Sequence, residues 1–403
     1  MFKLRNNLGA SYSPLYFLSA LGAGGLSISF FIYLMFLTPH HNTPIPTWES
    51  LMAAFQGGNP WMQGLIAVSM LGLALFALLH IRMLVWNSVE YLRYKRSDTY
   101  QGLRRSNGEV QLMALPLTFA MTINVGFAIG AVFVPNLWSV VEYLFPVAIA
   151  AFAITGLFTL KILMSFMARA LSTGSFDCTR NNSLSQLLAM FALTMVGVGF
   201  SASAAMSHVA LTSGIAMILA LMFLSFAALL GVIVLVLGFR GMLQQGVDRE
   251  ASVSLWIIIP IITLASIAIY RLIMGMHHNF GTEVQPIHNL AMFTVCVSIQ
   301  MLFAILGFLV MKRLGYFAEY LYGTGKSVGS FSLVCPGVAA FVMAFFFIHV
   351  GLIGSGLVAK FSIAHFVLLA PLVLLQLKTI ATLFRLNFKL LKPEPRASLA
   401  VAV

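Results

Sequence analysis

A small set of polar and helix-breaking residues interrupts the long apolar runs of this sequence, and these residues are the best placed to do chemistry. Hydroxyl and amide side chains recur beside prolines, which remove backbone hydrogen bonds. Broken backbone at membrane depth is tolerated where it faces protein or a water-filled path. The pattern therefore predicts a polar path. Its candidate pore and gate residues are Cys335, Pro336, Phe331, Phe200, Pro260, Pro116, Thr122, Asn124, Ser203 and Thr263.

The charges of this path favour anions over cations. Acidic residues are missing from the middle of the apolar runs, and Glu142 lies near the end of one. Cation channels and proton relays usually contain buried acids or acid–histidine chains. Arg271 and Lys360 instead lie at one mouth of the predicted path and would attract anions. A second interpretation of Arg271 is that its side chain extends to the membrane interface, since it lies near the end of its run.

Histidine is concentrated at the same mouth. His208, His278 and His349 are candidates for anion attraction there. The alternative is a redox membrane protein, or an accessory subunit, whose histidines hold haem or a metal. The spacings HxxxH and CxxCH are absent. We expect no cofactor, and the absence of a nucleotide-binding loop, catalytic triad or metal motif predicts that the chain is not an enzyme.

The elements that must position these residues are membrane helices. The chain has 403 residues, of which 60% are hydrophobic and 8% are charged, and its mean hydropathy is +0.96. Soluble domains carry about 25% charged residues. Too few charged groups are present to coat a water-soluble globule, so the composition predicts an all-α integral membrane protein.

Ten apolar runs are long enough to cross a bilayer, which takes about 20 residues. We expect one transmembrane domain over residues 1–392 and a disordered tail over 393–403. Odd-numbered runs hold most of the proline, glycine and hydroxyl residues, which predicts odd helices around a central path and even helices facing lipid. The runs lie at roughly 15–37, 62–88, 112–134, 138–165, 185–207, 210–238, 253–275, 290–312, 330–356 and 360–384.

The basic residues predict the orientation. The net charge is +12, and all lysines and arginines except Arg271 and Lys360 fall on the side of the two termini. Because basic loops stay in the cytoplasm, we expect a multi-pass protein of the cell inner (plasma) membrane with both termini cytoplasmic. The positive charge then records orientation and attracts anionic lipid headgroups, and it does not predict a nucleic-acid partner.

Three of the apolar runs carry distinctive short segments. The ninth run contains Ser330-Phe-Ser-Leu-Val-Cys-Pro336-Gly337, and the seventh contains Ser254-Leu-Trp-Ile-Ile-Ile-Pro260. The first begins Pro14-Leu-Tyr-Phe17 and continues into a glycine-rich turn. These segments resemble the tellurite-resistance/dicarboxylate transporter family, which includes the plant slow anion channels. The ten-run layout is also similar over the whole chain.

This resemblance implies a quasi-fivefold barrel of five helical hairpins, odd helices inside, and a homotrimer with one pore in each protomer. It also implies a phenylalanine on the ninth run that closes the pore. This sequence has Cys335 at that position. A divergent member is therefore expected, with the gate missing or supplied by Phe331, Phe200 or Phe341.

The sequence as a whole predicts an anion channel or transporter of the inner membrane. The cargo classes left open are a small inorganic anion, an oxyanion such as sulfite or tellurite, and a dicarboxylate. No pair of arginines suited to a dicarboxylate is evident, which favours a small anion. Anions and the lipid bilayer are the expected partners.

Overall fold

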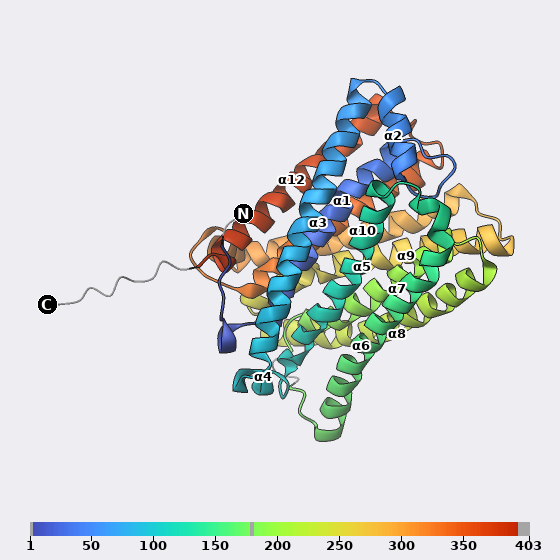
Figure 1. Cartoon of the computed structure of the whole chain (residues 1–403). Coiled ribbons are helices and arrows are strands. Elements are labelled where there is room, and N and C mark those ends of the chain that lie inside the picture. Colours follow the sequence, from blue (N-terminus) through green and yellow to red (C-terminus); the bar gives the residue numbers. More distant parts are fainter. Residues whose placement is uncertain (1–2, 178–180, 394–403) are drawn as a thin grey trace.

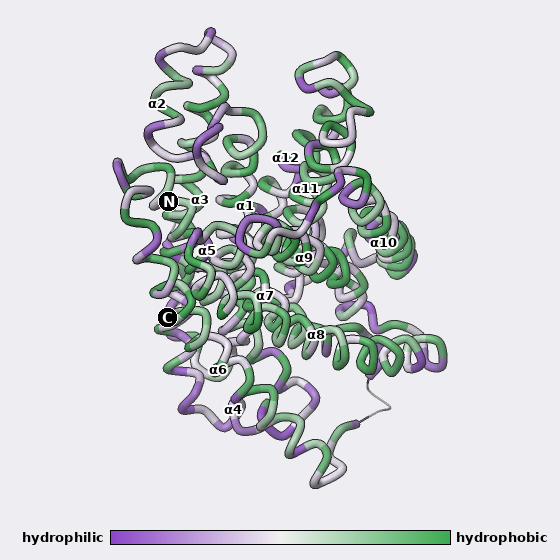
Figure 2. The backbone as a smooth tube through the Cα atoms, turned by 90° about the vertical axis from the view of Figure 1, so that its right-hand side faces the viewer, coloured by the Kyte–Doolittle hydropathy of each residue, from purple (hydrophilic) through white to green (hydrophobic). Residues whose placement is uncertain are grey.

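The computed structural model describes residues 3–177 and 181–393, and this part of the chain is helical and without strands. The predicted disordered tail, except Pro393, lies outside the described residues. Ten helical segments are long and apolar enough to cross a membrane, which confirms the predicted number of spans and a multi-pass membrane protein. The long helices run alongside one another (Figure 1). Helices such as α8 and α10 are hydrophobic along most of their length (Figure 2).

The helix bounds extend several predicted spans, because a helix continues past the apolar stretch that marks it. The helices are α1 (Phe17–Leu37), α2 (Trp48–Gly57), α3 (Pro60–Tyr94), α4 (Asp98–Leu103), α5 (Ala114–Phe133), α6 (Val141–Thr173), α7 (Leu188–Met206), α8 (Ala210–Gln245), α9 (Ile258–Phe280), α10 (Pro286–Arg313), α11 (Val334–Phe346) and α12 (Ile363–Leu391). The π-helical segment η10 (Phe347–Ile353) extends α11, and a second π-helical segment is η8 (Phe317–Tyr322).

Burial alternates along the chain. The first, third, fifth, seventh and ninth spans have 72%, 56%, 94%, 61% and 61% of their apolar window buried. The even spans have 44%, 28%, 17%, 22% and 22%. As a group, the even spans are nevertheless at least as apolar as the odd ones, so their exposed surface is suited to lipid rather than water. The odd helices therefore form the interior of the chain.

The helices of the odd-numbered spans, here called the odd helices, contact one another in a closed ring. They are α1, α5, α7, α9 and α11, and the even helices are α3, α6, α8, α10 and α12. Helix α1 packs on α5, α5 on α7, α7 on α9, α9 on α11, and α11 returns to α1. Each even helix packs against the odd helix before it in the chain and against the odd helix that follows it around the ring. For example, α6 lies against both α5 and α7, and α12 against both α11 and α1. This arrangement leaves the inner faces of the five odd helices directed at a common centre.

Every odd span begins with a short 3₁₀ segment before its α-helix. These segments are η2 (Pro14–Tyr16), η3 (Asn107–Met113), η6 (Ser185–Leu187), η7 (Glu250–Ile257) and η9 (Val328–Leu333). Pro116, Pro260 and Pro336 are each the third residue of the α-helix that follows. Proline is tolerated in the first turn, where its missing N–H has no partner to lose. These prolines therefore interrupt their spans at the change from 3₁₀ to α-helix, and not in the middle of a regular α-helix.

Polar side chains of the even helices bond to the odd helices. Gln300 of α10 donates to the Ile259 carbonyl (2.9 Å) and to the Thr263 hydroxyl (2.6 Å). Gln376 of α12 donates to Ser29 (2.8 Å) and accepts from Tyr33. With no water in the bilayer core, such groups need protein partners. These bonds fix the rotation of the outer helices about the ring.

The two ends of the chain meet at one end of the bundle, here called the termini end. The Arg5 N–H donates to the Leu391 carbonyl (2.8 Å). Buried Glu109 at this end pairs with Arg104 (3.1 Å) and Arg169 (2.9 Å). Glu109 raises the pKa of Arg104 through a side-chain hydrogen bond. The opposite end, here called the far end, carries α2 and the loop between η10 and α12.

Gly199 of α7 provides a test of this packing. A Cβ there would collide with the Phe152 ring of α6, whereas a Cβ on Gly126 of α5 would meet nothing within 4 Å. Overpacking a close contact costs about 1–3 kcal/mol. We expect Gly199→Ala to lower the midpoint of thermal unfolding in detergent, and Gly126→Ala to leave it unchanged or raise it. Equal midpoints for the two variants would contradict the α6–α7 contact.

Candidate functional site

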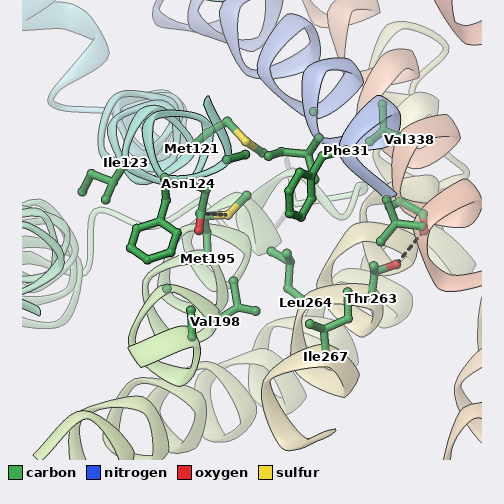
Figure 3. A pocket seen from close by; sticks show the side chains of 18 of the residues that line it. Phe31, Met121, Ile123, Asn124, Met195, Val198, Thr263, Leu264, Ile267 and Val338 are labelled. Carbon is green, nitrogen blue, oxygen red and sulfur yellow. Dashed lines mark hydrogen bonds between the residues drawn. The ribbon is translucent and has the colours of Figure 1, made fainter. Parts of the chain in front are cut away.

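A cavity of about 190 Å³, here called the apolar cavity, lies inside the ring of odd helices. All five odd helices line it, and the outer helix α6 adds Ala148 and Phe152. Side chains from different helices converge in it, among them Phe31 of α1, Met195 of α7 and Leu264 of α9 (Figure 3). Along α9 the lining runs from Pro260 to Arg271, about 16 Å at 1.5 Å per residue. The cavity is therefore elongated along the bundle.

The cavity wall is mostly apolar, and only a few of its polar groups are free. Thr263 donates to the Ile259 or Ala339 carbonyl and accepts from Gln300. The Asn124 amide donates to the Ala120 carbonyl (3.1 Å) and to the Met195 sulfur (3.7 Å), a contact visible in Figure 3. The Ser203 hydroxyl lines the cavity and makes no hydrogen bond within the described residues. Ser203 and Arg271 therefore supply the donors available to a guest.

Arg271 is the charged residue of this wall within the described chain. Its Nη1 donates to the Val198 carbonyl of α7 (3.2 Å). The ion pairs found in residues 3–177 and 181–393 leave it without a carboxylate partner. Val198 lies eight residues before the end of α7, about 12 Å below that end. The guanidinium thus points into the bundle, and the interpretation that it extends to the interface does not fit its contact.

A second cavity of about 430 Å³ lies toward the termini end. Its wall is more polar and includes Asp248, Glu250, Ser254 and Gln186. Phe191, Pro260 and Cys335 line both cavities. These three residues, from α7, α9 and α11, therefore form the boundary between the two spaces. One of them, Cys335, is the position at which the family resemblance would put the closing phenylalanine.

Phe191 is the residue of this boundary that the sequence analysis missed. Its side chain is 4% exposed, and it is the aromatic residue shared by both cavity walls. Prolines mark the equivalent level of α5, α9 and α11, but α7 has Met190 as its third residue. The sequence therefore carried no mark that aligned Phe191 with Cys335.

Several predicted pore residues lie elsewhere. Phe331 packs on Tyr16, with ring centroids 6.3 Å apart. Phe200 packs on Phe152 and Phe223. Neither phenylalanine lines either cavity, and the third gate candidate, Phe341, packs against Tyr33 and Phe345.

The remaining pore candidates divide between the cavities and the helix contacts. Pro336 lines only the cavity at the termini end. Pro116 is buried in the first turn of α5, outside both walls. Thr122 contacts His80 Nε2 of α3 (2.9 Å) and also lies outside the cavities. The apolar cavity wall thus retains Asn124, Ser203, Thr263, Pro260 and Cys335 from the predicted set.

The other predicted far-end residues do not line the apolar cavity. Lys360 lies in the loop before α12 over the Phe361 ring (5.2 Å), and partial burial lowers its pKa. His208 is exposed and its backbone N–H donates to Glu142. His278 contacts the Ala205 carbonyl (3.4 Å). His349 is buried against His365. In the described residues no group of three or more His, Cys, Asp or Glu could hold a metal ion.

Comparison with known proteins adds no relative. No protein-family model matches the chain, and no protein of curated function matches it significantly. The site must therefore be interpreted from its own geometry.

The boundary between the cavities can be tested without measuring transport. In a Cys178→Ser/Cys296→Ser background, Cys335 is the remaining thiol. We expect Phe191→Ala to raise its rate of reaction with a charged, water-soluble methanethiosulfonate at least tenfold, measured by intact-protein mass spectrometry, because the ring no longer covers the boundary. Phe200→Ala removes a phenylalanine of the same helix outside the cavities. The same rate increase in both variants would contradict the role of Phe191.

Proposed function

We propose that the chain is an anion channel or transporter that moves small anions through a central pore in each protomer. The observation that carries this proposal is the Arg271 guanidinium, which lies in an apolar cavity without a carboxylate partner. Burying an unpaired charge is costly, and intramembrane charges mark ion or substrate pathways. An anion that entered the cavity would compensate the charge.

The closed contact ring supports the pore. The two cavities lie on either side of Phe191, Pro260 and Cys335, so together they extend through much of the bundle. In this proposal five helical hairpins surround the path, with odd helices inside. Phe191 takes the occluding role that the family resemblance would assign to a phenylalanine of the ninth span. A ring at a narrow apolar point excludes water, and an ion there loses hydration without replacement.

The distribution of basic residues supports the proposed orientation. The termini end would face the cytoplasm of the inner membrane, where Arg and Lys accumulate, and its bases would contact anionic lipids. Asp248 and Glu250 line the cavity at that end. They would repel anions, so the path is electrostatically asymmetric, with attraction on the far side of the boundary. A homotrimer is proposed on the family resemblance alone.

The proposal predicts protein-dependent anion flux. Purified protein in liposomes, with the voltage set by valinomycin and K⁺, is tested with chloride, nitrate, sulfite and malate. We expect monovalent anions to move and Arg271→Gln to lower the flux at least tenfold, because the only charge of the apolar cavity wall in the described chain is lost.

Lys360→Gln is the matched control, since Lys360 is a base at the far end that lies outside the apolar cavity wall. We expect it to change the flux less than twofold. Equal losses in the two variants would place the anion attraction outside the cavity. The absence of flux for all four anions in well-folded protein would overturn the proposed function.

A further inference from the structure

The apolar cavity constrains the kind of anion that fits it. Beyond Arg271 and Ser203, its donors are already bonded, and its remaining surface comes from side chains such as Phe31, Leu264 and Val338 (Figure 3). A strongly hydrated inorganic anion would lose water here and gain few hydrogen bonds. A dianion would also leave one charge uncompensated, because one guanidinium balances one charge.

Resting on the proposed function, we infer that the preferred guest is a monovalent anion with a short apolar tail, such as a short-chain carboxylate or sulfonate. Its head would bond Arg271 and Ser203. Its tail would lie along the apolar wall toward Val338 and the boundary at Phe191. The elongated shape and the volume of about 190 Å³ suit a chain of a few methylenes better than a compact sphere.

The test uses alkanesulfonates, which stay charged and do not cross the bilayer as neutral acids. Inhibition of nitrate flux by methane-, ethane-, propane- and butanesulfonate is measured in liposomes. Each buried methylene is expected to tighten inhibition about fourfold. Butane-1,4-disulfonate is expected to inhibit at least tenfold more weakly than butanesulfonate.

Val338→Thr changes the apolar wall at constant shape and is expected to flatten the dependence on chain length. Val232→Thr, on the exposed face of α8, serves as its control and leaves that dependence unchanged. Nitrate flux with inhibition independent of chain length, or with equal inhibition by the disulfonate, would overturn this inference and leave the proposed function standing. Absence of flux for chloride, nitrate, sulfite and malate alike would overturn the proposed function and this inference with it.

A separate observation concerns a buried histidine pair at the far end. His365 of α12 and His349 of η10 are 0% and 8% exposed, and their Nε2 atoms lie 3.1 Å apart. The Phe361 N–H donates to His365 Nδ1 (3.0 Å). His349 Nδ1 lies 2.9 Å from the Phe345 carbonyl.

These contacts define where the protons must lie. A backbone N–H only donates, so His365 Nδ1 accepts and its proton is on Nε2. That proton is donated to His349 Nε2, and His349 therefore carries its proton on Nδ1, facing the Phe345 carbonyl. Every group is satisfied when both rings are neutral. A further proton on His349 Nε2 would face the N–H of His365 Nε2, and a further proton on His365 Nδ1 would face the Phe361 N–H. Either proton breaks a hydrogen bond.

The pair joins the loop before α12 to the packed aromatic residues of the far end. Phe361 has a positive φ of 63°, which a non-glycine residue adopts only at a cost. His349 stacks on Phe36 of α1, with ring centroids 4.6 Å apart. Phe36 in turn packs on Phe346, which lines the apolar cavity.

Other titratable groups surround the pair. Lys360, in the adjoining loop, lies over the Phe361 ring next to the pair. His40, in the loop after α1, lies near Lys360, and burial lowers its pKa. Tyr33 of α1 packs on Phe345 and Tyr270 of α9 packs on Phe346. Helix α10, which packs on η10, carries His288 in its first turn.

We propose that the His349–His365 pair is an acid-sensitive latch that holds the 354–362 loop and the far end of the cavity wall while both rings are neutral. Hydrogen–deuterium exchange of residues 354–366 is measured at pH 7.5 and 5.0 and corrected for the intrinsic pH dependence of exchange. We expect protection to fall at least tenfold at pH 5.0, because protonation breaks the chain of hydrogen bonds.

The variant His349→Gln/His365→Gln can keep the chain of hydrogen bonds without a titratable ring, and its protection is expected to change less than twofold. His208→Gln, which replaces an exposed far-end histidine, is expected to behave as the unmodified protein. Unchanged protection in the unmodified protein, or an equal loss in the double variant, would overturn the latch.

The double variant tests the latch only if it folds, and a measurement on the unmodified protein covers the case in which it does not. NMR of ¹³C,¹⁵N-histidine-labelled protein at pH 7.5 reports ring protonation directly. The His349 ring is expected to carry its proton on Nδ1 there, and the His365 ring on Nε2. A charged ring at pH 7.5, or the same tautomer in both rings, would overturn the assignment.

Discussion

The bilayer offers no water to satisfy polar groups, and this constraint orders most of the structure. Each helix bonds its own backbone, and the polar side chains of the outer helices turn inward to find partners. Gln300 bonds the first turns of α9, and Gln376 bonds Ser29 of α1. The result is a ring whose rotation is fixed by hydrogen bonds, while packing of small and aromatic residues, such as Gly199 under Phe152, sets the distances.

The same constraint makes the exceptions informative. Arg271 is an ionised group inside the ring whose protein partner is a single carbonyl, and the Ser203 hydroxyl beside the same cavity is unused within the described chain. The Thr263 hydroxyl, which lines the same cavity, is by contrast bonded on both sides. Buried polar atoms of Ser327 and Asn387 also lack partners in the described chain, but these residues lie outside the cavity wall. Arg271 and Ser203 are therefore the unused donors that a guest of this cavity would meet.

The two ends of the bundle differ in their chemistry. The termini end is held by ion pairs, such as Glu109 with Arg104 and Arg169, and its cavity carries acids. The far end instead contains the neutral His349–His365 chain, aromatic stacking and Lys360. A neutral histidine chain is sensitive to acid because added protons have no acceptor within it.

The sequence by itself determined the ten spans and the alternation of inner and outer helices, because helix length and hydropathy are local properties that the bilayer selects directly. It also marked Pro260 and Arg271, because a proline or a charge in an apolar run is visible without a fold, and the family resemblance marked Cys335. Only the tertiary structure decided that Phe191 shares the boundary with Cys335, that Phe331 and Phe200 lie outside the cavities, and that His349 faces His365. Those facts depend on the rotation and axial register of one helix against another. That register is set by side-chain packing between residues far apart in the sequence, which apolar helices of similar composition do not reveal.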